Sequence, residues 1–234
     1  TDKYDDIITF ADLTSGERYT GLDRITNAND ITLSLATTHT NVNTDTLSLK
    51  IAQTFYTDDE VVSDTINSNY ETRKSYSDIA ASIDVAINNF VFGSKVQFNP
   101  DKSLIVKREN SLSYKVSPRK FTSLTYSDDG TTRTGQIYAT YPLSKSIHVF
   151  GALDRKITKA TSTGVINSYT SGIAYESCCW AIRIAHFQDD NKQGIGGYDY
   201  STGFELVLTG LGSSATPLKG KIESNIPGYQ ANLR

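Results

Sequence analysis

The stretch IAASIDVAIN, residues 79–88, has the pattern of a β-strand with one apolar and one polar face. Apolar residues take every second position and polar residues stand between them: Ile79, Ala81, Ile83, Val85 and Ile87 against Ser82, Asp84 and Asn88. Successive side chains of a strand point to opposite faces, so this alternation separates the two kinds of residue in space. The length of roughly ten residues is what a tilted barrel strand needs to cross a membrane.

The same alternation recurs along the whole chain. It predicts about eleven strands, near 31–40, 45–57, 77–88, 90–106, 109–116, 120–128, 134–142, 145–154, 164–176, 180–189 and 198–211, with a twelfth near 4–12. There is no linker or low-complexity tract, so we expect one architecture throughout residues 1–234. The predicted fold class is all-β, an antiparallel transmembrane β-barrel of which the chain is the C-terminal portion.

The connections between these strands alternate in length. Tight connections at 41–44, 88–89, 117–119 and 142–146 take turns with longer ones at 13–30, 58–76, 155–163 and 190–197, and a short one near 107–109 breaks the rule. Short turns on one rim and long loops on the other are typical of outer-membrane barrels. With a periplasmic C-terminus, as is usual for such barrels, the long loops are expected outside the cell.

A soluble β-sandwich also alternates apolar and polar positions and is the alternative fold. Two observations favour the barrel. Charged residues occupy the predicted inward face: Lys50, Asp84, Arg183 and Glu205. Aromatic residues collect near strand ends, as in the girdles at a membrane interface: Phe55, Tyr56, Tyr141, Tyr175, Trp180 and Tyr198. A requirement for detergent would distinguish the barrel from the sandwich.

Composition narrows the class of protein further. The chain has 23 basic and 26 acidic residues and a net charge of −3, without the basic stripe that a nucleic-acid partner requires. Only 38% of its residues are hydrophobic, and no apolar run reaches the roughly 18 residues of a membrane-spanning helix. The sequence begins without Met or a signal segment, so we expect a processed secreted protein or a fragment.

Cys178 and Cys179 are adjacent, and the chain has no other cysteine. Neighbouring Cα atoms lie about 3.8 Å apart, whereas an ordinary disulfide joins Cα atoms roughly 4.4–6.8 Å apart. A mutual disulfide would therefore distort the peptide between them. Either both are free thiols, or each pairs with a cysteine that this chain lacks. The connection count places them on the periplasmic rim, in a compartment where disulfides persist.

Catalytic and metal-binding patterns are absent from the sequence. The three histidines, His39, His148 and His186, fall one per predicted strand without ligand spacing, and no nucleotide-binding loop or nucleophile elbow is found. The acidic groups at 58–60 and 128–129 are interpreted as solvated loop residues rather than as a cation site. We therefore expect neither an enzyme nor a bound cofactor or metal.

Four segments, in order along the chain, resemble the LptD family of LPS-assembly outer-membrane proteins. They are Arg18–Ile25 followed by Asn27–Asn29, the cysteine turn Ser177–Arg183, the last strand and its exit in Gly203–Leu206 and Leu208–Ser213, and the closing Ser224–Tyr229. The cysteine doublet with its aromatic neighbour is the most specific of these matches. The strands between them match only in pattern.

The resemblance implies a 26-stranded barrel joined to an N-terminal periplasmic domain and plugged by an LptE-type lipoprotein. Lipopolysaccharide (LPS) would pass from that domain and its periplasmic bridge proteins into the barrel and leave sideways between the first and last strands. The resemblance also implies that Cys178 and Cys179 bond to two cysteines of the N-terminal portion. That domain, the first barrel strands and the partner cysteines are not in this sequence.

The expected function is therefore LPS translocation and insertion into the outer leaflet of the Gram-negative outer membrane, with the surrounding lipid as a further partner. The expected site residues are the cysteines, the last strand (Tyr200, Gly203, Phe204, Leu206, Leu208 and Gly210) and the loop motif (Gly21, Asp23 and Arg24). A general porin-like or adhesin-like barrel is the alternative. The sequence of the complete protein distinguishes the two, because only an LPS transporter carries the periplasmic domain with its cysteines.

Overall fold

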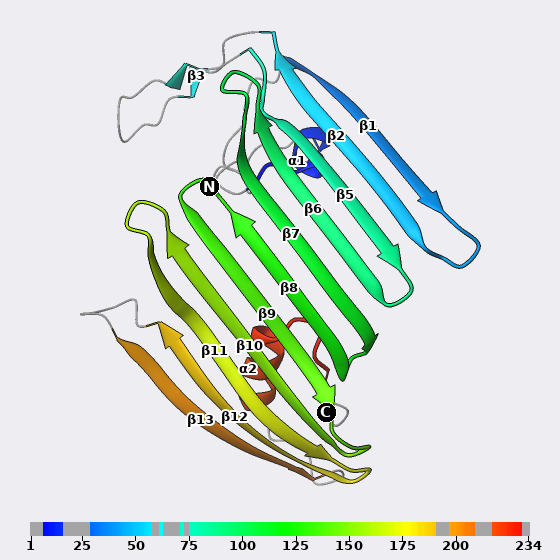
Figure 1. The fold of residues 1–234 in the computed structure, drawn as a ribbon, viewed down its shortest axis with the longest axis vertical. Helices are drawn as coiled ribbons and strands as arrows, with labels where there is room; N and C mark the ends of the chain where they lie inside the picture. The colour runs from blue at the N-terminus through cyan, green and yellow to red at the C-terminus, as the bar shows by residue number, and fades with distance from the viewer. Residues whose placement is uncertain are drawn as a thin grey trace. The chain divides into compact units, whose positions relative to one another are not determined.

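A computed structural model describes residues 7–15, 29–57, 61–62, 71–72, 75–190, 197–208 and 217–230, and these are almost entirely antiparallel β-strands (Figure 1). In chain order the elements are α1 (Phe10–Thr14), β1 (Asp30–Thr40), β2 (Thr46–Tyr56), β3 (Val61–Val62), β4 (Glu71–Thr72), β5 (Ile79–Ile87), β6 (Phe90–Asn99), β7 (Leu104–Ser117), β8 (Lys120–Asp128), β9 (Thr132–Pro142), β10 (Ile147–Thr158), β11 (Thr163–Glu176), β12 (Trp180–Asp190), β13 (Tyr198–Leu208) and α2 (Pro217–Asn225).

Eleven strands form one sheet in the order β1-β2-β5-β6-β7-β8-β9-β10-β11-β12-β13, and β3 pairs with β4 separately. Each strand of the large sheet lies beside the strand that precedes it in that order, and β1 and β13 form its two ends. The final pair is in register over its full length, from Trp180 opposite Leu208 to Asp190 opposite Tyr198. The predicted all-β antiparallel fold of about eleven strands is confirmed.

Two predicted connections are wrong. The fourth turn lies at residues 100–103 and not at 107–109, because Pro100 has no N–H for the strand ladder and Ser103 takes a left-handed conformation with φ 49°. The loop expected at 155–163 is a turn at 159–162, since β10 continues to Thr158. The loops expected at 58–76 and 190–197 lie mostly outside the described residues.

The predicted strand near 4–12 is also wrong, because a short helix, α1, begins at Phe10. The Thr9 hydroxyl accepts a hydrogen bond from the Asp12 amide at 3.3 Å, and the Asp12 carboxylate accepts one from the Thr9 amide at 2.8 Å. This reciprocal capping satisfies two backbone donors that a helix start leaves free, so it overrides the strand pattern. Leu13 of α1 packs with Ala52 and Ala80 of the sheet.

The described residues divide into two compact units. The first lies within Thr1–Asn88, Phe92–Asn110 and Ser127–Gly130, and the second within Asn89–Val91, Ser111–Tyr126 and Thr131–Arg234. The second contains α2 and β9 to β13, on which the rest of the description concentrates. Neither α1 nor α2, in the part of the chain that is described, is long and apolar enough to span a membrane.

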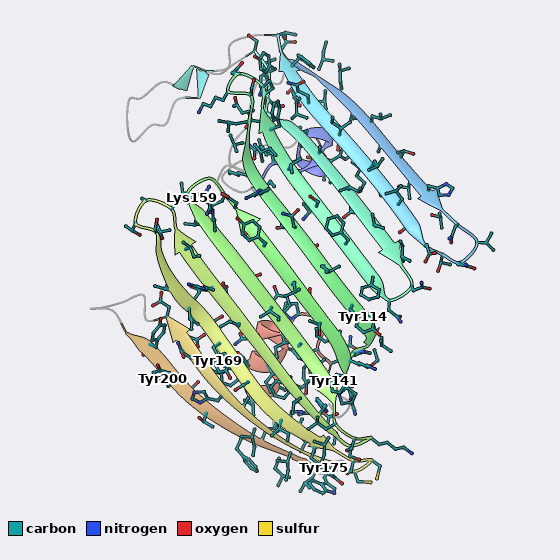
Figure 2. All side chains as sticks on the ribbon, viewed as in Figure 1. Tyr114, Tyr141, Lys159, Tyr169, Tyr175 and Tyr200 are labelled. Carbon is teal, nitrogen blue, oxygen red and sulfur yellow. The ribbon has the colours of Figure 1, made fainter. Side chains whose placement is uncertain are left out.

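One face of the second unit is apolar and exposed. Its large exposed side chains include Leu112, Leu124, Ile137, Tyr141, Tyr169, Ile173, Trp180, Ile184, Phe204, Leu206 and Leu208. Tyr114, Tyr141 and Tyr175 lie at the strand ends that carry the short turns (Figure 2). In the first unit the exposed set includes Ile31, Leu33, Leu35, Leu47, Leu49, Ile51 and Phe55. Contiguous apolar surface of this extent marks contact with lipid or protein, and no second large sheet covers it in the described chain.

Residues 217–230 pack against the opposite face of the second unit. Leu218, Ile222 and Ile226 follow one another at intervals of four and are buried, as is Tyr229. They form one cluster with sheet residues of this opposite face, here called the inner face: Phe121, Phe150, Ala174, Ala185 and Phe187. These four apolar residues, spaced among polar ones, give the segment an apolar side that packs on the sheet.

Gly172 of β11 is required by close packing within this cluster. A Cβ atom added there would lie 2.4 Å from the Phe150 ring and 2.5 Å from the carbonyl oxygen of Ile184. Real Cβ atoms do not approach backbone this closely, so the position is restricted to glycine by its neighbours.

We predict that Gly172→Ala lowers the free energy of unfolding of the full-length protein by about 1–3 kcal/mol, the usual cost of overpacking. The control is Gly135→Ala in β9, where a Cβ meets nothing within 4 Å. Urea unfolding in detergent, followed by the mobility shift of the folded barrel on gels, measures both. Equal midpoints for the two variants would contradict the packing assigned to Gly172.

Candidate functional site

The turn between β11 and β12 carries the two cysteines. The Ser177 hydroxyl donates to the Trp180 carbonyl at 2.9 Å and accepts from the Trp180 amide at 3.1 Å, which closes the turn. The rings of Tyr175 and Trp180 pack against each other across its base, with centroids 4.6 Å apart and planes tilted by 31°. Cys178 and Cys179 lie at its tip, both free and exposed. The turn therefore presents both thiols to solvent while its base is held by a hydroxyl and two rings.

The two thiols influence each other. Their Sγ atoms are 2.7 Å apart. The pKa of Cys179 is raised, first by its hydrogen bond with Cys178 and then by the charge that Cys178 acquires on ionisation. Since the thiolate is the nucleophile in disulfide exchange, the raised pKa lowers the fraction of Cys179 that is ready to react.

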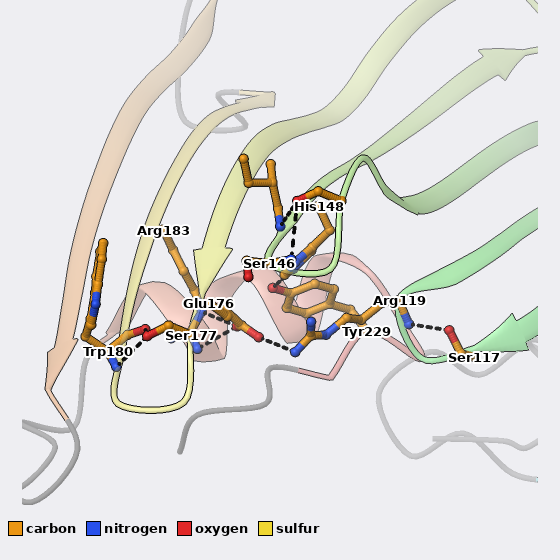
Figure 3. A network of polar contacts seen from close by, with 11 residues as sticks. Ser117, Arg119, Ser146, His148, Glu176, Ser177, Trp180, Arg183 and Tyr229 are labelled. Atoms are coloured by element: carbon orange, nitrogen blue, oxygen red, sulfur yellow. Dashed lines mark hydrogen bonds and ion pairs between the residues drawn. The ribbon is translucent and has the colours of Figure 1, made fainter.

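A cluster of four charges, three of them buried, lies next to the turn; Figure 3 shows Arg119, Glu176 and Arg183 of this cluster. Glu176, the last residue of β11, accepts from Arg183 Nη2 at 2.9 Å and from Arg119 Nη2 at 2.7 Å. Arg183 Nη1 also donates to Glu205 of β13 at 2.8 Å. The Arg183 and Glu176 side chains are 0% exposed and that of Glu205 is 1% exposed. The cluster ties the turn between β7 and β8 to β11, β12 and β13.

The charges in the cluster balance, because two guanidinium groups face two carboxylates. Removing an ion from water costs several kcal/mol, and only well-placed partners offset that cost. Arg183 makes three hydrogen bonds to two carboxylates, with its Nε at 3.2 Å from Glu176. A buried ion cluster of this kind adds little net stability compared with apolar side chains of similar volume. Its charges are paired, however, in only one arrangement of the strands.

Tyr229 connects the cluster to the C-terminal residues. Its hydroxyl lies 2.9 Å from His148 Nε2, and its ring packs 5.2 Å from that of Phe150, between centroids. Burial raises the pKa of Tyr229, and the negative charge of Glu176 raises it further. The phenol therefore stays neutral over the physiological range. His148 Nδ1 is buried and has no hydrogen-bond partner in the described structure.

The residues expected in the last strand separate into two groups. Tyr200, Phe204, Leu206 and Leu208 are exposed on the apolar face. Gly203 lies on the opposite face, against Leu218. Gly210 of the last strand and Gly21, Asp23 and Arg24 of the loop motif fall outside the described residues.

Sequence reasoning identified Arg183 and Glu205 as inward charges but missed Glu176, Arg119 and His148. A usable signal was present, because Glu176 interrupts the inner face of β11 at the position nearest the cysteines. Its partners become apparent only once neighbouring strands are aligned, with Arg183 opposite Glu205. The described residues contain no group of His, Cys, Asp and Glu suited to hold a metal ion.

The sheet, with one exposed apolar face and an opposite face that buries charges, defines a β protein of the outer-membrane barrel class, represented here by part of its strands. Comparison with known families identifies the family: residues 2–151 match the model of LptD, LPS transport system D. The chain belongs to the LptD family. This is a transport family, and the chain is not an enzyme.

Known proteins similar to the chain are LPS-assembly proteins LptD. That of Shewanella frigidimarina is 30% identical over 222 residues, which cover 84% of this chain and 28% of the relative. That of Pseudoalteromonas atlantica is 28% identical over 94% of the chain and 30% of the relative. That of Bordetella pertussis is 24% identical over 90% of the chain and 29% of the relative. The chain thus spans less than a third of the length of these relatives.

We predict that Arg183→Met destabilises the folded protein by about 3–5 kcal/mol, because it removes the cation that two buried carboxylates share and leaves Arg119 paired with Glu176. The matched control is Lys95→Met, which breaks a pair of similar length, 2.8 Å to Glu109, whose side chains are 45% and 34% exposed. That pair is worth about 0–1 kcal/mol. Urea midpoints measure both changes, and a loss no larger at Arg183 than at Lys95 would contradict the assigned role.

Proposed function

We propose that this chain forms the closing part of an outer-membrane barrel that moves LPS to the cell surface and inserts it into the outer leaflet. The observation that carries the proposal is a transport-family sheet whose two faces differ: one is apolar and exposed, and the other carries buried ion pairs beside an apolar cluster. The apolar face suits the acyl region of a bilayer. The polar face suits the sugar portion of a large amphiphile.

The transport step is non-covalent. Hydroxyl and charged groups on the inner face form hydrogen bonds with the sugars. The acyl chains pass sideways into lipid at the edge of the sheet formed by β13. In hydrocarbon each unpaired backbone group costs several kcal/mol, so a seam opens readily only where few ladder hydrogen bonds must break. β13 has one neighbour, β12, in the described sheet, which supports its assignment as one side of the seam.

The proposed partners follow from family membership. They are an LptE-type lipoprotein within the barrel, LPS itself, periplasmic bridge proteins reached through an N-terminal domain, and outer-membrane lipid. The relatives are more than three times as long as the matched segment, which leaves room for the domain and the remaining strands. A general porin or adhesin gives no role to an exposed cysteine pair, and a sandwich would cover the apolar face.

We predict that a disulfide between Thr202→Cys in β13 and a cysteine in the first strand of the complete barrel abolishes LPS export, since the seam cannot then separate. Surface LPS on intact cells is the measurement, and the abundance of folded barrel checks that assembly succeeded. The control is Thr202→Cys with His186→Cys, which are opposite each other in β13 and β12. That disulfide joins β13 to β12 rather than to the first strand, so we expect LPS export to stay normal. Export through a fully cross-linked seam would refute lateral exit.

We also predict that Cys178 and Cys179 each bond to a different N-terminal cysteine in the full-length protein. Such bridges close very long loops, worth about 4–5 kcal/mol in the chain-entropy model. Either single Ser substitution is tolerated because one bridge remains, whereas the double substitution impairs LPS delivery and admits large antibiotics. Ser144→Ala with Lys145→Ala, in another turn, is the control. Non-reducing mass spectrometry tests the pairing directly, and two free thiols in the functional protein would disprove it.

A further inference from the structure

Residues 217–230, here called the C-terminal segment, lie across the inner face of four consecutive strands. Tyr229 meets His148 of β10, and Asn225 Nδ2 donates to the Thr170 hydroxyl of β11 at 2.9 Å. Lys221 lies over Phe187 of β12, with Nζ 4.2 Å from the ring centroid. Leu218 contacts Gly203 of β13. The segment that follows the last strand thus returns to bridge β10 to β13.

A row of small residues receives the segment. Gly172, Ala185 and Gly203 are register partners across β11, β12 and β13, so they form a shallow strip on the inner face. The Phe150 ring fills the strip over Gly172. Leu218 fills it over Gly203, where an added Cβ would lie 2.5 Å from Leu218 Cδ1. The absence of a side chain at Gly203 is therefore what allows Leu218 to reach the last strand.

Polar contacts of the segment join the last two strands. Lys221 Nζ donates to the Ser201 hydroxyl of β13 at 3.2 Å and lies 3.4 Å from the Asp189 carboxylate of β12. The buried Arg183–Glu205 pair links the same two strands farther along. Both links lie on the inner face and cross the β12–β13 boundary, so they oppose separation at that boundary.

We propose that the C-terminal segment is an internal latch that holds β13 onto β12, so that the seam opens only at the other edge of β13. The inference rests on the proposed function and assigns Gly203, Leu218 and Lys221 as positioning residues for it. A terminal strand held by one ladder would otherwise be free to peel from β12 whenever its outer neighbour releases. With the latch in place, β13 stays with β10 to β12 as one body while LPS passes.

Hydrogen exchange of the β13 amides in the full-length complex tests the latch without requiring transport. Leu218→Asp places a charge against the strip and releases the segment, and we expect the amides of residues 198–208 to exchange about tenfold faster. Gly220→Asp adds the same charge on the open side of α2, where a Cβ meets nothing within 4 Å, and leaves exchange unchanged. Trypsin cleavage after Lys219 and Lys221 reports release of the segment. Release without faster exchange overturns the proposal.

A second variant keeps the test decisive if Leu218→Asp fails to fold. Thr170→Cys with Asn225→Cys replaces the hydrogen-bonded pair by a disulfide that fixes the segment to β11. A latch stays in place during transport, so we expect the oxidised variant to display LPS at the wild-type level and its β13 amides to exchange no faster. Loss of export only on oxidation would show that the segment must leave, which overturns the latch. Should wild-type complexes in vesicles move no LPS, the proposed function fails while the exchange result stands.

Discussion

The pairing of Arg183 with Glu176 and Glu205 is the interaction on which the second unit of this protein depends. A guanidinium that is 0% exposed is tolerated only if carboxylates surround it, and those carboxylates come from two different strands. Strands β11, β12 and β13 are therefore held in one register from the inside. A slip of one residue would turn every charge toward the apolar face.

A second constraint follows from the alternation of the strands. Most of their large exposed apolar side chains point outward, so the inner face contributes only part of a hydrocarbon core, with Phe121, Phe150 and Phe187. The C-terminal segment supplies the rest, with Leu218, Ile222 and Ile226 packed on the sheet. Charge pairing and an inserted segment thus replace the second sheet of a sandwich. The outer face remains exposed.

The same arrangement gives the cysteine turn a rigid base. Glu176 immediately precedes the turn and is fixed by both Arg119 and Arg183. The thiols beside it are exposed, and the contact with Cys178 raises the pKa of Cys179. A disulfide from this turn to another domain would therefore couple that domain to β8, β11, β12 and β13 together. Strand β13, the cysteine turn and the C-terminal segment share one support.

The amino-acid sequence by itself determined the strands, their antiparallel order and the division of the sheet into an apolar and a polar face, because these depend on a local period of two residues. It also determined that Cys178 and Cys179 are too close for an unstrained mutual bond. The helix cap formed by Thr9 and Asp12 was not recognised, because the strand pattern was given precedence there. Only the tertiary structure decided that Leu218 seats on Gly203, that Tyr229 reaches His148, and that Glu176 completes the cluster. These contacts join residues up to 81 positions apart, and they form only when strand register and the return of the chain place them on one face.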